Sequence, residues 1–236
     1  MRRYTFIPLF ILCMAWTQSV VSQQLVFSGI EGSVNSDISM RVLREAYKKL
    51  NIHITYRPLP GERAIQESNN GDVDGEVFRI SNVQKKYTNL IMVPTQINVL
   101  QAVVFSKEFA FEVNGWSSLV NYNIGIQLGI KFAERGTKGM NRIMVDTNEQ
   151  LFKMLNNGRV DIAVAALSNG LKTIRLLNFT DIKILQPPIK EFPLYHYLNK
   201  KHADLVPKIN DVLSGMKKSG RMKAIRESML KELFGV

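Results

Sequence analysis

The sequence predicts an α/β protein built from two similar lobes. The phrase NNGDVDGEV, which begins at Asn69, has a near copy in NNGRVDIAV, which begins at Asn156. Each copy follows a predicted helix and continues into an apolar run typical of a buried strand. The 236 residues, 45% of them hydrophobic, are enough for one large domain or two small ones. Because the whole helix–turn–strand unit recurs, two lobes are favoured.

The first 22 residues have the pattern of a secretory signal peptide. Arg2 and Arg3 precede an uncharged apolar run over residues 6–16, and small residues then lead to a cleavage-site pattern at Ser22. A membrane anchor is the alternative, but the run is short for a hydrocarbon core of roughly 30 Å. We therefore expect signal cleavage near Ser22 and a periplasmic location.

The one cysteine of the chain, Cys13, lies inside this apolar run. Ile11 and Leu12 precede it where a lipid-modified cysteine needs small residues, which disfavours lipidation. Removal of the signal peptide leaves no cysteine, and this excludes disulfides, thiolate metal sites and cysteine nucleophiles.

The net charge of +11 raises the question of an anionic partner. Apolar residues recur along the densest basic stretch, residues 216–231, and just beyond it at the spacing of one helix face: Met222, Ile225, Met229 and Leu233. We interpret the basic side chains as the solvated face of a packed helix, and nucleic-acid binding is not expected.

The first lobe is predicted to begin with a βαβ unit. Strands are expected over residues 25–30 and 52–56, with a helix over 36–50 between them. A helix over GERAIQES follows, and the Asn70-Gly71 pair supplies the left-handed residue that ends it. Further strands are expected over residues 73–78, 90–93 and 97–105, the last one long enough to pass into the second lobe.

The second lobe is predicted to repeat this series. Thr147 and Gln150 have capping-box spacing at the start of the helix before the second copy. Pro187, Pro188 and Pro193 are expected to break the chain. The predicted strands cover residues 123–128, 143–145, 160–167, 182–185 and 194–198, and helices over 203–215 and 221–234 are expected to pack back on the first lobe.

Four blocks of this sequence, in order, resemble a known family: NNGDVDGEVFRI, NIGIQLGIKF, EQLFKMLNNGRVDIAVAAL and INDVLSGMKKSGRMKAI. They are similar to successive blocks of the bacterial extracellular solute-binding proteins of family 3, periplasmic receptors typified by polar amino-acid binders. The resemblance covers residues 24–232. It implies a type II periplasmic-binding-protein-like fold, in which two α/β lobes close on a small molecule.

The resemblance also implies a division of the chain and its partners. Lobe 1 is expected to contain residues 23–100 plus 193–236 and lobe 2 residues 101–192, with hinges near 99–104 and 189–194. The expected function is capture of a small polar ligand, anionic or amino-acid-like, by a monomer that delivers it to an ABC-type permease. The alternative is a ligand-sensing or partner-binding module with the same fold.

Ligand sites in such sheets collect outside the carboxyl ends of strands and at helix amino ends. This rule predicts the ligand-binding residues Arg79, Glu31, Arg63, Phe78, Gln127, Lys131 and Ser168. Arg79 is the leading candidate, because a guanidinium can hold a carboxylate with two parallel hydrogen bonds. The alternatives are a structural ion pair for Arg79, a solvated helix face for Arg63, a core position for Phe78 and a helix cap for Ser168. Glu31 is expected to pair with a cationic ligand group or with one of the arginines.

Departures from the family pattern bear on the ligand. Ala165 and Ala166 stand where such receptors carry a carboxylate for the ligand's ammonium group, and Asp161, at the strand start, is expected to be structural. Lys131 follows Gly129-Ile130 in place of the family's small hydroxyl residue.

The family's carboxylate-binding arginine would fall near Lys85 or Lys86, so either Arg79 or a lysine near Lys86 is the expected anchor. An anionic or atypical ligand fits the predicted cations Arg63, Arg79 and Lys131.

Catalysis is the competing class. His53, His196 and His202 belong to no recognisable nucleophile or metal spacing. Asp72 and Asp74 flank the helix-stop turn, where solvated residues are expected. We therefore predict a protein that is not an enzyme and has no cofactor and no metal.

Overall fold

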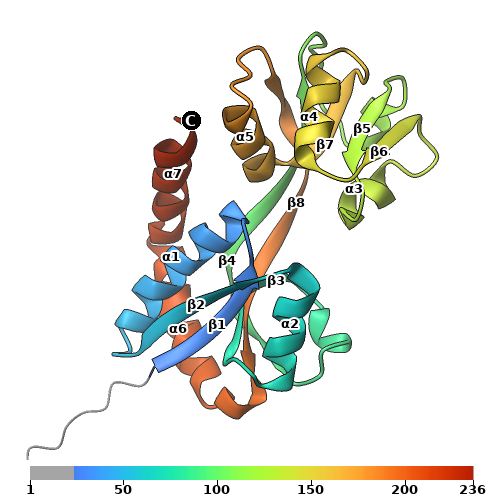
Figure 1. Ribbon diagram of the computed structural model, residues 1–236. Helices are drawn as coiled ribbons and strands as arrows, with labels where there is room; N and C mark the ends of the chain where they lie inside the picture. The colour runs from blue at the N-terminus through green and yellow to red at the C-terminus, as the bar shows by residue number, and fades with distance from the viewer. Residues whose placement is uncertain (1–23, 236) are drawn as a thin grey trace, which may run out of the picture.

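Two long strands join two α/β lobes (Figure 1) in the computed structural model, which describes residues 24–235. Strand β4 (Leu90–Ser106) and strand β8 (Lys183–Asn199) pair antiparallel, from Leu90 opposite Asn199 to Ser106 opposite Lys183. One eight-stranded sheet therefore runs through both lobes, in the order β2-β1-β3-β8-β4-β7-β5-β6. The predicted two-lobed α/β fold is confirmed. The predicted signal peptide lies outside the described residues.

Lobe 1 is a βαβ unit completed by the last part of the chain. Strand β1 pairs parallel with β2 on one side and with β3 on the other. Phe27 of β1, Leu43 and Tyr47 of α1, and Ile209 and Leu213 of α6 share one buried core, so the predicted packing of the tail on this lobe is confirmed. The elements are β1 (Gln24–Ile30), α1 (Val34–Lys48), β2 (His53–Leu59), α2 (Gly61–Asn70), β3 (Gly75–Ile80), η1 (Val83–Lys85), η3 (Lys200–His202), α6 (Leu205–Lys218) and α7 (Arg221–Phe234).

Lobe 2 has a core on each face of its part of the sheet. Phe105 and Phe152 meet edge to face in one core, at 4.9 Å between ring centroids, and Ile124 and Ile126 lie in the other. Thr147 forms the predicted capping box at the start of α4. The elements are η2 (Trp116–Leu119), β5 (Ile124–Gln127), α3 (Lys131–Gly136), β6 (Arg142–Val145), α4 (Asn148–Asn156), β7 (Ile162–Ala166) and α5 (Leu167–Leu176).

The repeated phrase performs the same structural task in both lobes. Gly71 and Gly158, with φ of 88° and 66°, turn the chain out of α2 and α4 in the left-handed conformation. The Asp74 carboxylate then accepts a hydrogen bond of 2.7 Å from a backbone N–H of β1, and the Asp161 carboxylate accepts one of 2.8 Å from the backbone N–H before β5. Each aspartate fastens the turn to the neighbouring strand, and the predicted structural role of Asp161 is confirmed.

The predicted break at the prolines is wrong, because β8 runs through Pro187, Pro188 and Pro193 without ending. All three prolines precede Leu194, where pairing with β3 begins. Pro193 pairs with β4 alone, whereas Pro187 and Pro188 lie in an irregularity of the β4 pairing between Leu185 and Lys190. A proline, which has no N–H, is tolerated at an unpaired strand edge and at such an irregularity. Likewise, the two strands expected before the crossover are the single strand β4, with shifts of register between Met92 and Asn98.

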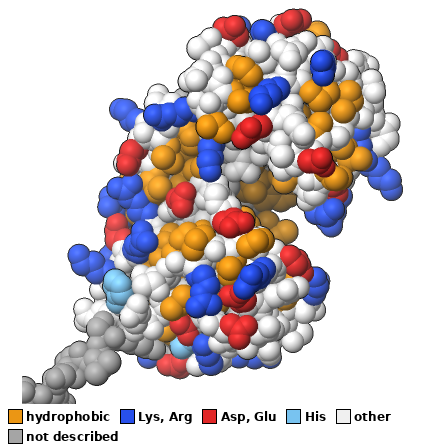
Figure 2. All heavy atoms as spheres, viewed as in Figure 1, with side chains coloured by type: hydrophobic (Ala, Val, Ile, Leu, Met, Phe, Trp, Pro, Cys, Tyr) orange, Lys and Arg blue, Asp and Glu red, His pale blue; other side chains and the backbone are white. Residues whose placement is uncertain are grey.

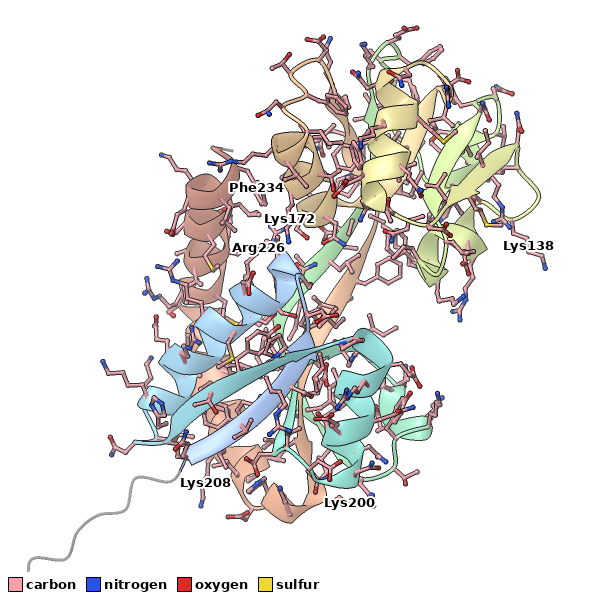
Figure 3. The ribbon with its side chains drawn as sticks, in the orientation of Figure 1. Lys138, Lys172, Lys200, Lys208, Arg226 and Phe234 are labelled. Atoms are coloured by element: carbon pink, nitrogen blue, oxygen red, sulfur yellow. The ribbon has the colours of Figure 1, made fainter. Side chains whose placement is uncertain are left out.

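The crossover belongs to both lobes at once. Both expected hinge segments lie inside paired strands, and the exact lobe boundaries stay a prediction. Helix α7 also reaches across: Arg226 donates to Gln101 of β4 at 2.8 Å, and Arg175 of α5 donates to the Leu233 carbonyl. Figure 3 shows Arg226 and Phe234 on this helix, near α5. Among residues 24–235, no helix has the length and apolar character needed to span a membrane.

We expect Gly75→Ala to lower the free energy of unfolding by about 1–3 kcal/mol, because overpacking is destabilising. A Cβ at Gly75 would lie 2.2 Å from the backbone oxygen of Tyr197 in β8. The measurement is urea unfolding.

Gly215→Ala is the matched control. A Cβ at Gly215 would meet nothing within 4 Å, and the residue lies inside α6. The same change should therefore stabilise the protein by about 0.5–1 kcal/mol. Equal effects of the two substitutions would contradict the close approach of β3 and β8.

Candidate functional site

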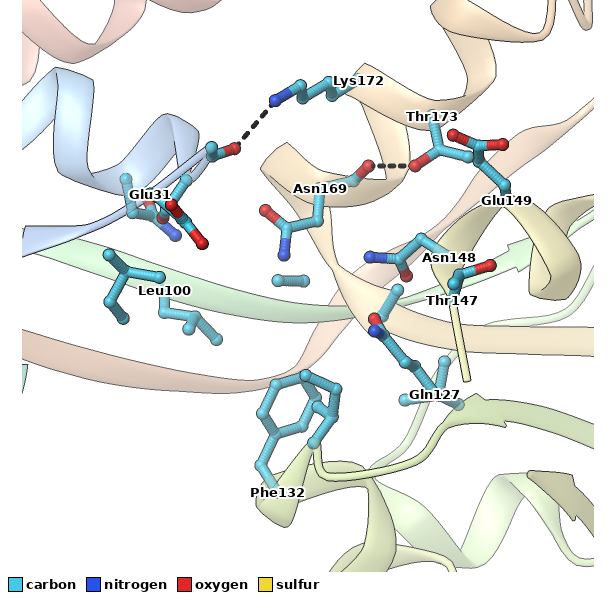
Figure 4. Close-up of a pocket in the computed structure, with 18 of the residues that line it drawn as sticks. Glu31, Leu100, Gln127, Phe132, Thr147, Asn148, Glu149, Asn169, Lys172 and Thr173 are labelled. Carbon is cyan, nitrogen blue, oxygen red and sulfur yellow. Dashed lines mark hydrogen bonds between the residues drawn. The ribbon is translucent and has the colours of Figure 1, made fainter. Parts of the chain in front are cut away.

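A cavity of about 430 Å³ lies between the lobes, on the side that the crossover leaves open (Figures 2 and 4). Lobe 1 and the crossover contribute the end of β1, the turn into α1, Phe78 and Leu100. Lobe 2 contributes the ends of β5 and β7 and the first turns of α4 and α5. The polar or charged residues of the lining are Glu31, Ser33, Asn35, Gln127, Thr147, Asn148, Glu149, Asn169, Lys172 and Thr173.

The strand ends explain why polar groups gather here. Glu31 follows β1, Gln127 is the last residue of β5, and Ala166 is the last residue of β7. Carboxyl ends of parallel strands open onto the same edge of a sheet, where a ligand meets backbone and side-chain groups. The side chain of Gln127 is held by a hydrogen bond of 3.0 Å to the carbonyl of Asp146. The sheet therefore positions both walls of the cavity.

Five polar side chains of the lining have no hydrogen bond or ion pair with any other described residue. These are the hydroxyl of Ser33, the carboxylates of Glu31 and Glu149 and the amides of Asn148 and Asn169. Figure 4 shows Asn148 and Asn169 near each other on the lobe 2 side of the cavity, with Glu31 on the opposite side. Unpaired groups of this kind can hydrogen-bond a polar solute without breaking existing contacts.

Lys172 spans the gap between the lobes. Its Nζ atom, on α5, donates a hydrogen bond of 2.8 Å to the carbonyl of Gly32 in lobe 1 (Figure 4). A backbone carbonyl leaves the positive charge of Lys172 without a carboxylate partner among the described residues. The cavity thus combines two carboxylates with one ammonium group.

Arg79 is committed to a buried ion pair. Its Nη2 atom lies 2.9 Å from Oε1 of Glu76, and it also donates to the Gly61 carbonyl at the start of α2. The other carboxylate oxygen of Glu76 accepts hydrogen bonds from Ser28, at 2.7 Å, and Ser68, at 3.3 Å. Arg79 lies within β3, not after it, and does not line the cavity.

Burial dominates the electrostatics of this cluster. Although Arg79, Ser28 and Ser68 favour the charged form, desolvation raises the pKa of Glu76 to about 7. The nearby His196 is fully buried, and desolvation lowers its pKa to about 4. Its Nδ1 lies 2.8 Å from the Glu76 carbonyl, which can only accept, so Nδ1 carries the proton and Nε2 accepts from Tyr47. His196 is a neutral core residue.

The other predicted site residues divide between the cavity and the surface. Glu31, Phe78 and Gln127 meet in the cavity. Arg63 pairs with Glu67 on the exposed face of α2 at 2.8 Å.

Lys131 pairs with Glu134 at 2.8 Å and faces a neighbouring cavity, while Lys86 pairs with Glu62 at 3.0 Å. The hydroxyl of Ser168 is buried, makes no hydrogen bond within residues 24–235 and does not line the cavity.

The sequence-based prediction missed Asn148, Glu149 and Lys172 as site residues, and Asn169, at a strand end indicated by the same rule, was interpreted as a helix cap. A signal for the first two was present, since they directly follow the Thr147 cap at a helix amino end. Lys172 had no such signal, because it faces the cleft only through its place on α5. Within the described residues, no group of three or more histidine, cysteine, aspartate or glutamate side chains is arranged to hold a metal ion.

Solved structures share this architecture. A histidine kinase sensor domain similar to periplasmic binding proteins is 18% identical, with a TM-score of 0.65, covering 89% of this chain and 96% of that one. The chain has a periplasmic-binding-protein-like fold. An amino-acid ABC transporter substrate-binding protein from Streptococcus pneumoniae, bound to L-arginine, is 14% identical, with a TM-score of 0.65 and coverage of 89% and 96%.

A third structure with this fold is an ancestral arginine-binding protein bound to arginine, 20% identical, with a TM-score of 0.64 and coverage of 87% and 97%. These neighbours are binding proteins and a sensor domain, not enzymes. No protein-family model matches the chain. A search of curated proteins gives no significant match.

The raised pKa of Glu76 predicts how stability depends on pH. The pKa is about 7 in the fold against 4.5 for an ordinary glutamate, so the folded state holds this proton more tightly than the unfolded state. The contribution of Glu76 to stability is therefore fully present below pH 4.5 and falls by about 3 kcal/mol as the pH rises to 7.

Urea unfolding of the wild type and Glu76→Gln between pH 4 and 8 measures this contribution as the difference between the two proteins. The lowered pKa of His196 makes its contribution to protein stability rise as the pH increases from about 4 to 6.5. This contribution is the same in both proteins, so it cancels in the difference. The difference should decline from pH 4.5 to 7. A difference that does not change with pH would show that Glu76 titrates normally.

Proposed function

We propose that the chain is a periplasmic solute-binding protein that captures a small polar ligand between its lobes and delivers it to an ABC-type permease. The observation that carries the proposal is the cavity of about 430 Å³, within the size range of small-molecule sites and lined from both lobes. The neighbours bound to arginine and glutamine support the capture of a small polar ligand by a protein of this fold.

The charges of the cavity favour an amino-acid-like ligand over a purely anionic one. Arg63, Arg79 and Lys131, the cations expected to hold an anion, each have a carboxylate partner. Glu31 and Glu149 are available for an ammonium group, and Lys172 for a carboxylate. Receptors of the resembling family carry a carboxylate for the ligand's ammonium group where this chain has Ala165 and Ala166. Glu31 and Glu149 would take over that role.

Closure of the lobes is expected because the groups proposed to contact the ligand lie on both lobes. A ligand held by Glu31 of lobe 1 and by Asn148, Glu149 and Asn169 of lobe 2 binds best when both walls reach it. Such a ligand shifts the equilibrium toward the closed arrangement by its difference in affinity for the two states. Bending within the paired crossover strands β4 and β8 would carry the motion.

Sensing is the second candidate function. It is favoured by one observation, the likeness of the whole chain to a histidine kinase sensor domain. Cells that lack this protein distinguish the two. Transport predicts loss of uptake of the radiolabelled ligand, whereas sensing predicts normal uptake and loss of a ligand-dependent phosphorylation signal.

A thermal-shift screen tests ligand capture. The purified protein, unfolded and refolded to remove carried ligand, is screened against amino acids, organic acids, polyamines and small sugars. A ligand at 100 times its dissociation constant should stabilise the protein by about 2.7 kcal/mol. We expect amino acids or amines to give the shift.

Single variants then locate the ligand. Glu31→Gln and Glu149→Gln should each weaken binding roughly tenfold, because each removes a charge-assisted hydrogen bond. Glu112→Gln, an exposed carboxylate in lobe 2 outside the cavity lining, is the control. Unchanged affinity in both cleft variants would place the ligand elsewhere, and silence across the library would contradict the proposed ligand class.

A further inference from the structure

A second cavity, of about 720 Å³, adjoins the first at the mouth of the cleft. The two share Leu100, Ile130 and Phe132. Lobe 2 forms one wall through η2 and the segment around α3, and the other walls are the end of β3 and the crossover strands. Figure 2 shows a hollow with apolar side chains in its depth between the lobes.

Aromatic side chains build the apolar part of this second cavity. Phe132 and Phe192 lie 5.6 Å apart, measured between ring centroids, and both are half-buried. Trp116 packs directly on Gly136, where an added Cβ would lie 2.3 Å from the indole ring. The missing side chain of Gly136 therefore allows the indole to form a wall. Ile80 adds an apolar side chain that is 49% exposed.

Cations surround this apolar surface. Lys131, Arg135 and Lys190 line the cavity, and its lining contains no aspartate or glutamate. Lys131 has Glu134 as partner, but Arg135 and Lys190 form no ion pair with any described residue. The Nζ atom of Lys190 lies 5.4 Å from the ring centroid of Phe192, beside the apolar surface.

The two cavities therefore differ in the charges that they offer. The first combines the unpaired carboxylates of Glu31 and Glu149 with the ammonium group of Lys172, whereas the second offers cations alone, with Arg135 and Lys190 unpaired beside aromatic rings. A molecule that pairs with these cations while burying an apolar body satisfies both properties of the second cavity. Hydrophilic anions would leave the aromatic wall uncovered, and neutral apolar molecules would leave the cations unpaired.

We propose that the second cavity is a binding site for a small carboxylate with an aromatic or branched aliphatic body. The carboxylate lies between Arg135 and Lys190, and the apolar body packs against Trp116, Phe132 and Phe192. This site goes beyond the proposed capture of a polar ligand and does not depend on it, because the charged groups that select each occupant are different residues, although Phe132 lines both cavities.

Trp116 makes the proposal directly measurable. The chain has two tryptophans, and in the full chain carrying Trp16→Phe the indole of Trp116 is the only one. The probe is 3-phenylpropionate, with 3-phenylpropionamide as its uncharged counterpart. Calorimetry measures affinity, and the emission of Trp116 reports whether the probe reaches this wall. We expect saturable binding with a shift in Trp116 emission, and about tenfold weaker binding of the amide.

Variants test the two cations. The double substitution Arg135→Gln and Lys190→Gln should weaken binding of 3-phenylpropionate about tenfold. The matched control neutralises two exposed lysines that do not line the cavity, Lys138 at the far edge of lobe 2 and Lys200 at the base of lobe 1 (Figure 3). Lys138→Gln with Lys200→Gln should leave affinity unchanged, and thermal unfolding should be alike in all proteins.

Several outcomes would overturn the proposal. These are absence of saturable binding, equal affinity for the acid and the amide, equal loss in both double variants, or binding of a carboxylated peptide but of no free aryl carboxylate. A ligand found for the first cavity should bind Arg135→Gln/Lys190→Gln normally, and 3-phenylpropionate should bind Glu31→Gln normally. Failure of one site is thereby distinguished from failure of the other.

Discussion

The antiparallel pairing of β4 with β8 is the interaction on which the rest of the structure depends. Each strand has 17 residues, and their shared ladder extends through the cores of both lobes. Because β3 joins β8 on one side and β7 joins β4 on the other, the two halves of the sheet are held edge to edge. The cleft is the space beside this ladder. Its width depends on how the ladder twists and bends, and its chemistry on the strand ends that each half presents.

Burial decides which charged groups remain available at the cleft. Arg79 lies inside lobe 1, where its positive charge balances the buried carboxylate of Glu76. Burial of an unpaired carboxylate would be strongly destabilising. Glu31, Lys172, Arg135 and Lys190 remain at the edges of the cavities, without charged partners among the described residues. These four groups come from distant parts of the sequence, and the sheet brings them to the two adjoining cavities.

Local patterns in the sequence predicted most of the fold and only part of the site. The repeated helix stop acts within a few residues of itself, so it is visible in the sequence, as was the structural role of Asp161. Asp74 was expected to be solvated, and its bond to β1 depends on which strand lies beside the turn. The continuity of β8 through its prolines was not visible either, because it depends on which edge of the strand lacks a partner. The cations of the predicted site failed as indicators for a different reason: each pairs with a carboxylate three or four residues away. These pairs are Arg79 with Glu76, Lys131 with Glu134 and Arg63 with Glu67. Glu31 and Gln127 were found because they directly follow or end a strand.

The position of lobe 2 within the chain has a consequence for the order of folding. Its strands β5, β6 and β7 and the helices between them lie between β4 and β8, whereas lobe 1 is split by this insertion. A growing chain has all of the parallel strands of lobe 2 before β8, α6 and α7 exist. The core around Phe27 and Tyr47, in contrast, needs Leu194 and Leu213 from the last fifth of the sequence. Closing such long-range contacts is slow and comes late. The apolar face of lobe 1 therefore stays incomplete until the end of synthesis, whereas lobe 2 can form its parallel strands earlier.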